Sequence, residues 1–214
     1  MANPFGQLVD DRKLDTMSDY VGKAKTQEDR AREAMRLINE HDKNGKARRY
    51  VDGLKTEYGN GATTLCMVYN ATGETLYYNT SRDWYGFIGR TPYPFEIGNG
   101  QWASFLHVKK TSAASGSEAA LVFRGKNASG QNRDFCLAWS SPWSGLYKNK
   151  AYCDVGSTGS FNRNWNTVYS NLQKRGGYTH STDDDGVNIK VSTAAGFSPL
   201  FVAEIRTPFA PKMK

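Results

Sequence analysis

The hydrophobic pattern of this chain changes its period once, near residue 60, and that change limits the folds open to it. Before Gly59-Asn60-Gly61, apolar residues recur at helical spacing. After these three residues, they fall in short runs that are typical of β-strands. With 214 residues, the chain is long enough for one all-β domain and a small extension. We therefore expect a mainly β protein with a helical N-terminal part.

Three segments are expected along the chain. Residues 1–25 are polar and show no regular pattern, which is typical of a flexible arm. Residues 26–58 contain two apolar stripes at helical spacing, so a pair of helices is predicted to pack on the core. Residues 59–214 carry the strand pattern and are predicted to form the core domain, a β-sandwich.

The first predicted helix has a clear start signal. Thr26 is followed by Asp29 in the partner position of a capping box, and the helix is expected to end near Glu40. A second helix is predicted over 46–58. Much later in the chain, 161–175 has apolar residues at helical spacing and predicts a short amphipathic helix.

Short strands at regular intervals, separated by Gly-rich turns, favour a sandwich or a barrel. The first two are expected to pair as a hairpin through the Asn70–Gly73 turn. The predicted strands are 64–70, 74–79, 94–97, 101–108, 119–124, 135–139, 151–155, 187–191 and 201–205.

Charge and cysteine content indicate the partners and the compartment. A net charge of +7 favours contact with anionic surfaces such as phospholipid headgroups, nucleic acid or acidic glycans. The basic residues are scattered and no recognition-helix signature is present, so nucleic acid is not the favoured partner. Cys66, Cys136 and Cys153 are predicted to be free, buried thiols. The N-terminus has no apolar signal core, and the expected location is cytoplasmic.

The sequence does not indicate catalysis, a metal site or a cofactor. His107 lies in a predicted strand among apolar residues, which is typical of a structural histidine. Ser115-Gly116-Ser117 has no base near it in sequence, and a hydrolase elbow is not expected. Asp183-Asp184-Asp185-Gly186 lacks the ligand alternation of a calcium loop, so a solvated acidic turn is expected.

The turn between the strands 135–139 and 151–155 is unusually aromatic. A soluble hairpin needs only Gly, Asn or Asp at its tip, yet this turn contains Trp143, Leu146 and Tyr147. Exposed groups of this kind usually meet a partner, and Trp and Tyr suit a membrane interface. On the turn alone, however, the favoured interpretation is that these side chains fold back over the end of the core.

A second set of aromatic residues follows on the predicted helix 161–175. Trp165 and Tyr169 lie one helical turn apart. Together with Trp143, Tyr147 and Tyr152, they have the composition of a cage that holds a cation over ring faces. The alternative is that Trp165 and Tyr169 only cover the sheet.

Several motifs resemble those of a known plant family. N-A-T-G-E-T-L over 70–76, P-F-E-I-G-N-G-Q-W-A-S-F over 94–105, G-S-E-A-A-L-V-F over 116–123 and W-S-S-P-W-S-G-L-Y-K-N-K-A-Y over 139–152 form a series. This series is similar to that of plant 23 kDa jasmonate-induced proteins. The resemblance extends over nearly the whole chain from about residue 26.

The core also resembles, more distantly, the actinoporin and cytolysin-like β-sandwich. The loop 140–149 and the segment R-x-W-x-x-x-Y-S-N-L over 163–172 carry this likeness. It implies an actinoporin-like sandwich with a lipid-headgroup pocket at one end. The residues that it assigns to this pocket are Ser140, Pro142, Tyr147, Trp165 and Tyr169, with Trp143 beside them. The chain departs from the pattern at Lys150, Ala151 and Ser170 and has no pore-forming N-terminal helix, so lysis is not expected.

The function expected from these features is non-catalytic and related to stress or defence. The protein would bind a lipid headgroup, or another small polar ligand, at the aromatic pocket and would associate peripherally with membranes. A lectin-like module that stacks sugar faces on the same rings is the first alternative. An RNA- or ribosome-associated stress protein is the second, and it rests on the net charge alone. The oligomeric state is left open.

Overall fold

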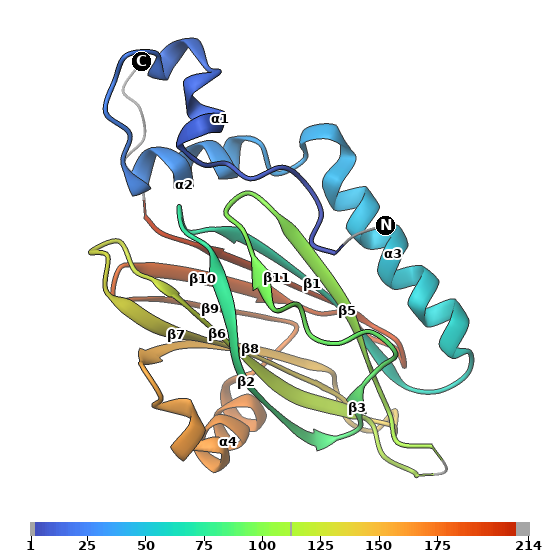
Figure 1. Ribbon diagram of the computed structural model, residues 1–214. Coiled ribbons are helices and arrows are strands. Elements are labelled where there is room, and N and C mark those ends of the chain that lie inside the picture. The colour runs from blue at the N-terminus through green and yellow to red at the C-terminus, as the bar shows by residue number, and fades with distance from the viewer. Residues whose placement is uncertain (1–2, 112, 209–214) are drawn as a thin grey trace.

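The computed structural model describes residues 3–111 and 113–208, and it contains two β-sheets packed face to face (Figure 1). Sheet A has the strand order β3 (Phe87–Ile88), β5 (Trp102–Val108), β1 (Thr63–Ala71), β11 (Leu200–Arg206), β10 (Val187–Ser192) and β9 (Thr179–Asp184). Sheet B has the order β4 (Glu96–Ile97), β2 (Leu76–Tyr85), β6 (Ser117–Lys126), β7 (Asn132–Ser141) and β8 (Lys150–Ser157). The predicted mainly β fold is confirmed.

Four α-helices lie in the described part of the chain, on the outer faces of the sheets: α1 (Asp11–Asp15), α2 (Gln27–Arg36), α3 (Lys43–Tyr58) and α4 (Trp165–Arg175). Short 3₁₀ turns precede or follow them at Ser18–Tyr20, Glu40–Asp42 and Phe161–Arg163. As expected from the capping box, the Thr26 hydroxyl accepts from the backbone N–H of Asp29, whose carboxylate accepts from the backbone N–H of Thr26. This helix ends at Arg36, earlier than predicted, and the 3₁₀ turn Glu40–Asp42, where His41 has φ of +52°, follows before α3.

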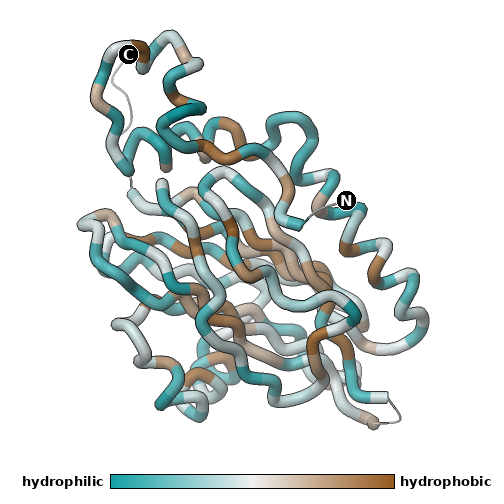
Figure 2. The backbone as a smooth tube through the Cα atoms, in the orientation of Figure 1, coloured by the Kyte–Doolittle hydropathy of each residue, from teal (hydrophilic) through white to brown (hydrophobic). Residues whose placement is uncertain are grey.

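Three apolar clusters hold these layers together. The central one fills the space between the sheets and includes Leu121, Trp139 and Phe201. A second lies between sheet A and the N-terminal helices, and a third lies between sheet B and α4. Figure 2 shows the result, with hydrophobic residues gathered on the central strands while much of the helical tube is hydrophilic. Both outer faces of the sandwich are therefore apolar in part, and helices cover them.

The N-terminal segment differs from the expected arm. Of the predicted 1–25, residues 1–2 lie outside the described part, but Phe5, Val9, Leu14 and Tyr20 are buried. Phe5 pairs with the edge of the sheet through two backbone hydrogen bonds to Trp102. The apolar residues are widely spaced between polar ones, so no periodicity revealed them.

The predicted hairpin of 64–79 is wrong. β1 belongs to sheet A, where it pairs with β11 in parallel and with β5 antiparallel, whereas β2 belongs to sheet B and pairs with β6. The turn between them crosses from one sheet to the other. Asn70 holds this crossing, because its Nδ2 donates to the carbonyl oxygens of Glu74 and Ile97, each at 2.7 Å.

Two strands were not predicted. β9 has the sequence THSTDD, which contains no apolar alternation, and β3 has only two residues. β9 pairs with β10 through a hairpin, so Asp183 and Asp184 lie in the strand and Asp185 and Gly186 form the turn. The acidic stretch predicted as one turn is therefore divided between the end of strand β9 and the turn to β10.

The cysteines are buried and free, as expected. Cys136 and Cys153 lie on the neighbouring strands β7 and β8. Cys136 packs in the cluster under α4, and Cys153 packs between the sheets. Cys153 lies opposite Leu137, the residue after Cys136. Successive side chains of a strand alternate between faces, so Cys136 and Cys153 face opposite sides of sheet B.

A buried polar network joins the two sheets at one end of the sandwich. His107 Nδ1 lies 2.8 Å from Ser117 Oγ, and Ser117 Oγ lies 2.8 Å from Thr64 Oγ1, which in turn lies 2.9 Å from Ser141 Oγ. His107 Nε2 lies 3.2 Å from Asp83 Oδ1. His107 is therefore a satisfied structural histidine, as predicted, although Ser117 does have a base beside it, which the sequence did not reveal.

Leu14 offers a test of whether the N-terminal segment is part of the fold. The Leu14 side chain is 0% exposed and Leu8 is 47% exposed, which makes the two leucines a matched pair. We expect Leu14→Ala to lower the free energy of unfolding by about 2–5 kcal/mol, because it leaves a cavity. Leu8→Ala should change it by less than about 1 kcal/mol. Denaturant unfolding measures both, and equal effects would contradict the packed segment.

His107 should make the stability depend on pH. Burial is the main cause that lowers the pKa of its imidazole, and the contact with Asp83 offsets this only in part. The unfolded state therefore binds a proton more readily than the folded state, so stability falls as the pH drops below about 6.5. We expect His107→Gln to reduce this slope between pH 7 and pH 5 by up to ~1.4 kcal/mol per pH unit, measured by urea unfolding. An unchanged slope would contradict a neutral, buried His107.

Candidate functional site

A row of polar side chains crosses the outer face of sheet B at the end that carries the His107 network. Glu118 on β6 lies opposite Ser140 on β7, and Ser140 lies opposite Lys150 on β8. Residues directly opposite one another share a face of the sheet. Two residues further along the same strands, the row is Ala120, Ala138 and Tyr152, and it is buried under α4. The polar row therefore lies where the helix cover ends.

Helix α4 contributes two side chains to this row. Val168 and Leu172 anchor the helix on sheet B. Tyr169 and Gln173, one helical turn apart, reach Glu118: the Tyr169 hydroxyl donates to Glu118 Oε2 at 3.4 Å, and Gln173 Nε2 donates to the same oxygen at 3.2 Å. Lys150 Nζ donates to the backbone carbonyl of Gln173 and, at 3.2 Å, to Gln173 Oε1.

The Glu118 carboxyl is the most buried ionisable group of the site. The residue is 7% exposed, and burial raises the pKa of its carboxyl above the ordinary value. Hydrogen bonds from Ser140, Tyr169 and Gln173 and the charge of Lys150 lower this pKa, but they do not cancel the effect of burial.

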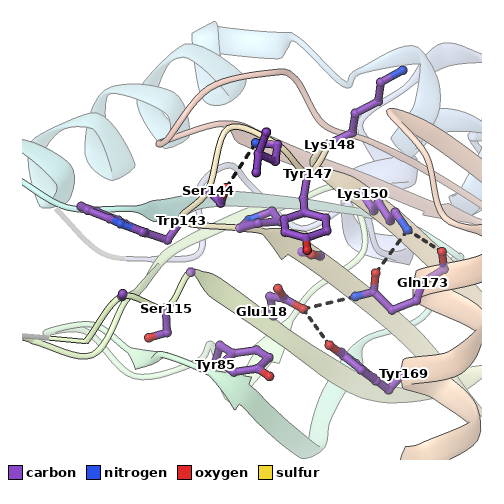
Figure 3. A pocket seen from close by; sticks show the side chains of 15 residues that line it. Tyr85, Ser115, Glu118, Trp143, Ser144, Tyr147, Lys148, Lys150, Tyr169 and Gln173 are labelled. Atoms are coloured by element: carbon purple, nitrogen blue, oxygen red, sulfur yellow. Dashed lines mark hydrogen bonds between the residues drawn. The ribbon is translucent and has the colours of Figure 1, made fainter.

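The loop between β7 and β8 forms the other wall. Pro142, Trp143, Leu146 and Tyr147 come from this loop, and with Tyr85, Glu118 and α4 they enclose a pocket of about 680 Å³. In the view of Figure 3, Glu118 lies between the Tyr147 ring and Tyr85. Lys109 Nζ sits 4.1 Å from the centroid of the Trp143 ring, so that ring already has a cation on one face.

The tip of this loop is exposed and apolar. Leu146 is 90% exposed and Tyr147 is 69% exposed, and Phe197 and Tyr178 are exposed close by, around a smaller cavity on the other side of the loop. Asn149 fixes the loop to its neighbour by donating to the carbonyl oxygens of Ala194 at 2.7 Å and Gly196 at 2.8 Å. The side chains at the tip do not fold back over the core.

Five of the six predicted site residues line the pocket: Ser140, Pro142, Trp143, Tyr147 and Tyr169. Trp165 does not line it. Its ring is partly buried and meets Trp84 edge-on at 6.5 Å, and both rings pack against the cluster under α4. Trp165 thus packs on the sheet, as the alternative expected, and the structure does not bring it to this pocket with Tyr147 and Tyr169.

Sequence reasoning missed the polar half of the pocket. Tyr85, Glu118, Lys150 and Gln173 all line it. A weak signal existed for Glu118, because it is a charged residue two positions before Ala120 and four before Val122, on the face that becomes buried. No group of three or more His, Cys, Asp or Glu side chains within the described residues is arranged to hold a metal ion. None of the described helices combines the length and the apolar composition that crossing a bilayer requires.

Comparison with known proteins agrees with the motifs. The family of Nakanori-like proteins matches residues 5–207. The chain is 38% identical over 174 residues to a 23 kDa jasmonate-induced protein of Hordeum vulgare, a match that covers 80% of this chain and 82% of that protein. It is 29% identical over 147 residues to a jasmonate-induced protein homolog of Atriplex canescens, covering 67% of this chain and 76% of the other.

The fold also has a solved counterpart. The crystal structure of the lipid binding protein Nakanori superposes with a TM-score of 0.86 at 26% identity, covering 94% of this chain and 98% of that one. The likeness to plant jasmonate-induced proteins, predicted from the motifs, is confirmed. The chain therefore belongs to the Nakanori-like family.

Proposed function

We propose that the protein binds the headgroup of a membrane lipid in the pocket formed by the β7–β8 loop, α4 and β6, without catalysing a reaction. The observation that carries this proposal is the combination of a 680 Å³ pocket with an exposed apolar loop tip at its mouth. A small-molecule pocket does not need an exposed apolar rim, whereas a lipid presents its headgroup together with an apolar surface.

The rim has the composition of an interfacial anchor. Leu146 can enter the acyl boundary, and the Trp143 and Tyr147 rings suit the headgroup level. Lys109 and Lys148 lie beside them, and each basic residue near an anionic leaflet adds about 1 kcal/mol to membrane association. This supports peripheral attachment through one end of the sandwich.

Family membership supports the same proposal. Nakanori is described as a lipid binding protein, and its structure covers nearly the whole of this chain. The plant relatives are jasmonate-induced, which supports a role in stress. We propose that this chain uses its pocket end for the lipid contact.

The arrangement of Asp83, His107 and Ser117 supports binding rather than catalysis. These residue types form the triad of serine hydrolases, but there the serine contacts Nε2 of the histidine and the aspartate contacts Nδ1. Here the two contacts are exchanged. Ser117 is also fully buried and hydrogen-bonded to Thr64, so its hydroxyl is not presented to a substrate.

Replacing Tyr147 tests the pocket. We expect Tyr147→Ala to weaken binding to lipid vesicles roughly tenfold, because one ring contact at the mouth is worth ~1.4 kcal/mol. Tyr77 is a matched control, since it is also an exposed tyrosine. It lies at the start of β2, whereas Tyr85 at the end of this strand lines the pocket. Vesicle sedimentation of folded variants measures the effect. If Tyr147→Ala binds as well as Tyr77→Ala, the pocket is not the lipid site. If glycans bind through Tyr147 and vesicles do not, the lectin-like alternative replaces it.

A further inference from the structure

A second concave site lies on the outer face of sheet B, at the end opposite the β7–β8 loop. α4 covers the middle of this face, and beyond it the start of β2, the end of β6 and the start of β7 enclose a pocket of about 560 Å³. This volume is usual for a small-molecule site. The side chains that line this far-end pocket include Thr75, Tyr77, Asn79, Arg124, Lys126 and Asn132. Of the described residues, none lines both pockets.

The far-end pocket contains a guanidinium that is held in one orientation. Tyr77 on β2 lies opposite Arg124 on β6, and Arg124 lies opposite Asp134 on β7. The fully buried Asp134 carboxylate accepts from Arg124 Nε at 2.8 Å and from Arg124 Nη2 at 3.1 Å. The third nitrogen, Nη1, has no hydrogen-bond partner among the described residues. A fixed guanidinium with a free nitrogen is suited to bind a carboxylate or phosphate oxygen.

Both carboxylates near this guanidinium have counter-ions within the protein. Asp134 is paired with Arg124. Glu74 lines the pocket, but its carboxylate lies 2.7 Å from a guanidinium nitrogen of Arg30. Lys126 also lines the pocket and forms no ion pair in the part of the chain that the structure describes. The charge that is left over in the far-end pocket is therefore positive, and it favours an anionic ligand.

The other side chains of the far-end pocket suit a ring that carries hydroxyl groups. Tyr77 is 48% exposed, and among the described residues no other aromatic ring or cation packs on its face. The hydroxyl of Thr75 and the amide of Asn132 form no hydrogen bond within the described residues. Asn79, the extra residue of a β-bulge, donates its Nδ2 to Asp134 at 3.1 Å and keeps its oxygen free. These groups donate and accept, as sugar hydroxyls require.

We propose that the far-end pocket binds an acidic sugar, that is, a pyranose ring that carries a carboxylate. The carboxylate would lie at Arg124 Nη1 and Lys126 Nζ. The apolar C–H face of the ring would stack on Tyr77, and its hydroxyls would meet Thr75 and Asn132. A simple anion would leave the exposed ring and the acceptors unused, and a neutral sugar would leave the positive charge unused. This proposal is independent of the lipid function, because the two pockets share no residue.

The positions of the two pockets allow both to be occupied at once. Tyr77 lines the far-end pocket and Tyr85 lines the pocket at the β7–β8 loop, at opposite ends of β2. At ~3.3 Å per residue, the strand separates these two tyrosines by roughly 25 Å. A protein built in this way is suited to connect an acidic polysaccharide to a membrane surface.

Three soluble probes separate the features of the ligand. Trigalacturonate has sugar rings with carboxylates, galactotriose has the same rings with hydroxymethyl groups instead, and citrate has three carboxylates and no ring. In calorimetry at physiological ionic strength, we expect the wild-type protein to bind trigalacturonate at least tenfold more tightly than either of the other two. If galactotriose or citrate binds as tightly as trigalacturonate, or if none of the three binds, the assignment is wrong.

Two variants place the site on the protein. Lys126→Gln should lose roughly tenfold of its affinity for trigalacturonate and narrow the preference over galactotriose, because one charge is removed. Tyr77→Ala should weaken the binding of trigalacturonate to a similar extent. Both side chains are exposed, so the variants are expected to fold. The matched control is Lys190→Gln on β10, also an exposed lysine, which should bind like the wild type. If either variant binds trigalacturonate like this control, the far-end pocket is not the site.

Vesicle sedimentation separates this proposal from the lipid function. Trigalacturonate should not displace the wild-type protein from lipid vesicles, and displacement would contradict a separate far-end site. If the protein binds trigalacturonate through Tyr77 and Lys126 but binds no vesicle, the acidic-sugar site is supported and the lipid function is wrong. If it binds vesicles but not trigalacturonate, the lipid function stands and the acidic-sugar site is wrong.

Discussion

The whole architecture depends on sheets that are apolar on both faces. β1 and β5 are buried along their full length, and β6 and β7 along most of theirs. Packing the sheets against each other buries only the inner faces, so each outer face needs a cover of its own. The N-terminal segment with α2 and α3 covers sheet A, and α4 covers the middle of sheet B. The helices are therefore a condition of the sandwich.

The pocket follows from the limited length of one of these covers. α4 shields the row of Ala120, Ala138 and Tyr152, and the next row, Glu118, Ser140 and Lys150, lies at its edge. The β7–β8 loop closes the space from the other side without filling it. The polar network of His107, Ser117, Thr64 and Ser141 links both sheets at the same end. Ser141 directly precedes the loop residue Pro142, so this network holds the start of the loop. A site at this position is bounded by sheet B, α4 and the β7–β8 loop, and it has one exposed apolar rim.

Much of this could be predicted from local patterns. The three main helices and most strands follow from periodicity, and the loop tip with Trp143 and Tyr147 follows from an excess of aromatic residues in a turn. Pairing across longer distances could not be predicted. The Asn70–Gly73 turn has hairpin composition, yet it connects two different sheets, because Asn70 bonds to the carbonyl oxygen of Ile97, far along the chain. The burial of Leu14 could not be predicted either, because a single apolar residue shows no periodicity.

The sequence by itself determined the fold class, the family and the aromatic loop, because each is written in short-range spacing or in contiguous motifs. Only the tertiary structure decided which side chains meet. Trp165 and Tyr169 look equivalent on their helix, and both rings contact Trp84, but only Tyr169 also donates to Glu118 and lines the pocket. Glu118 became a pocket residue because the register of β6, β7 and α4 places a carboxylate at the edge of an apolar face. The burial of Glu118 and its hydrogen bonds to Tyr169 and Gln173 are properties of that packing, and no local pattern encodes them.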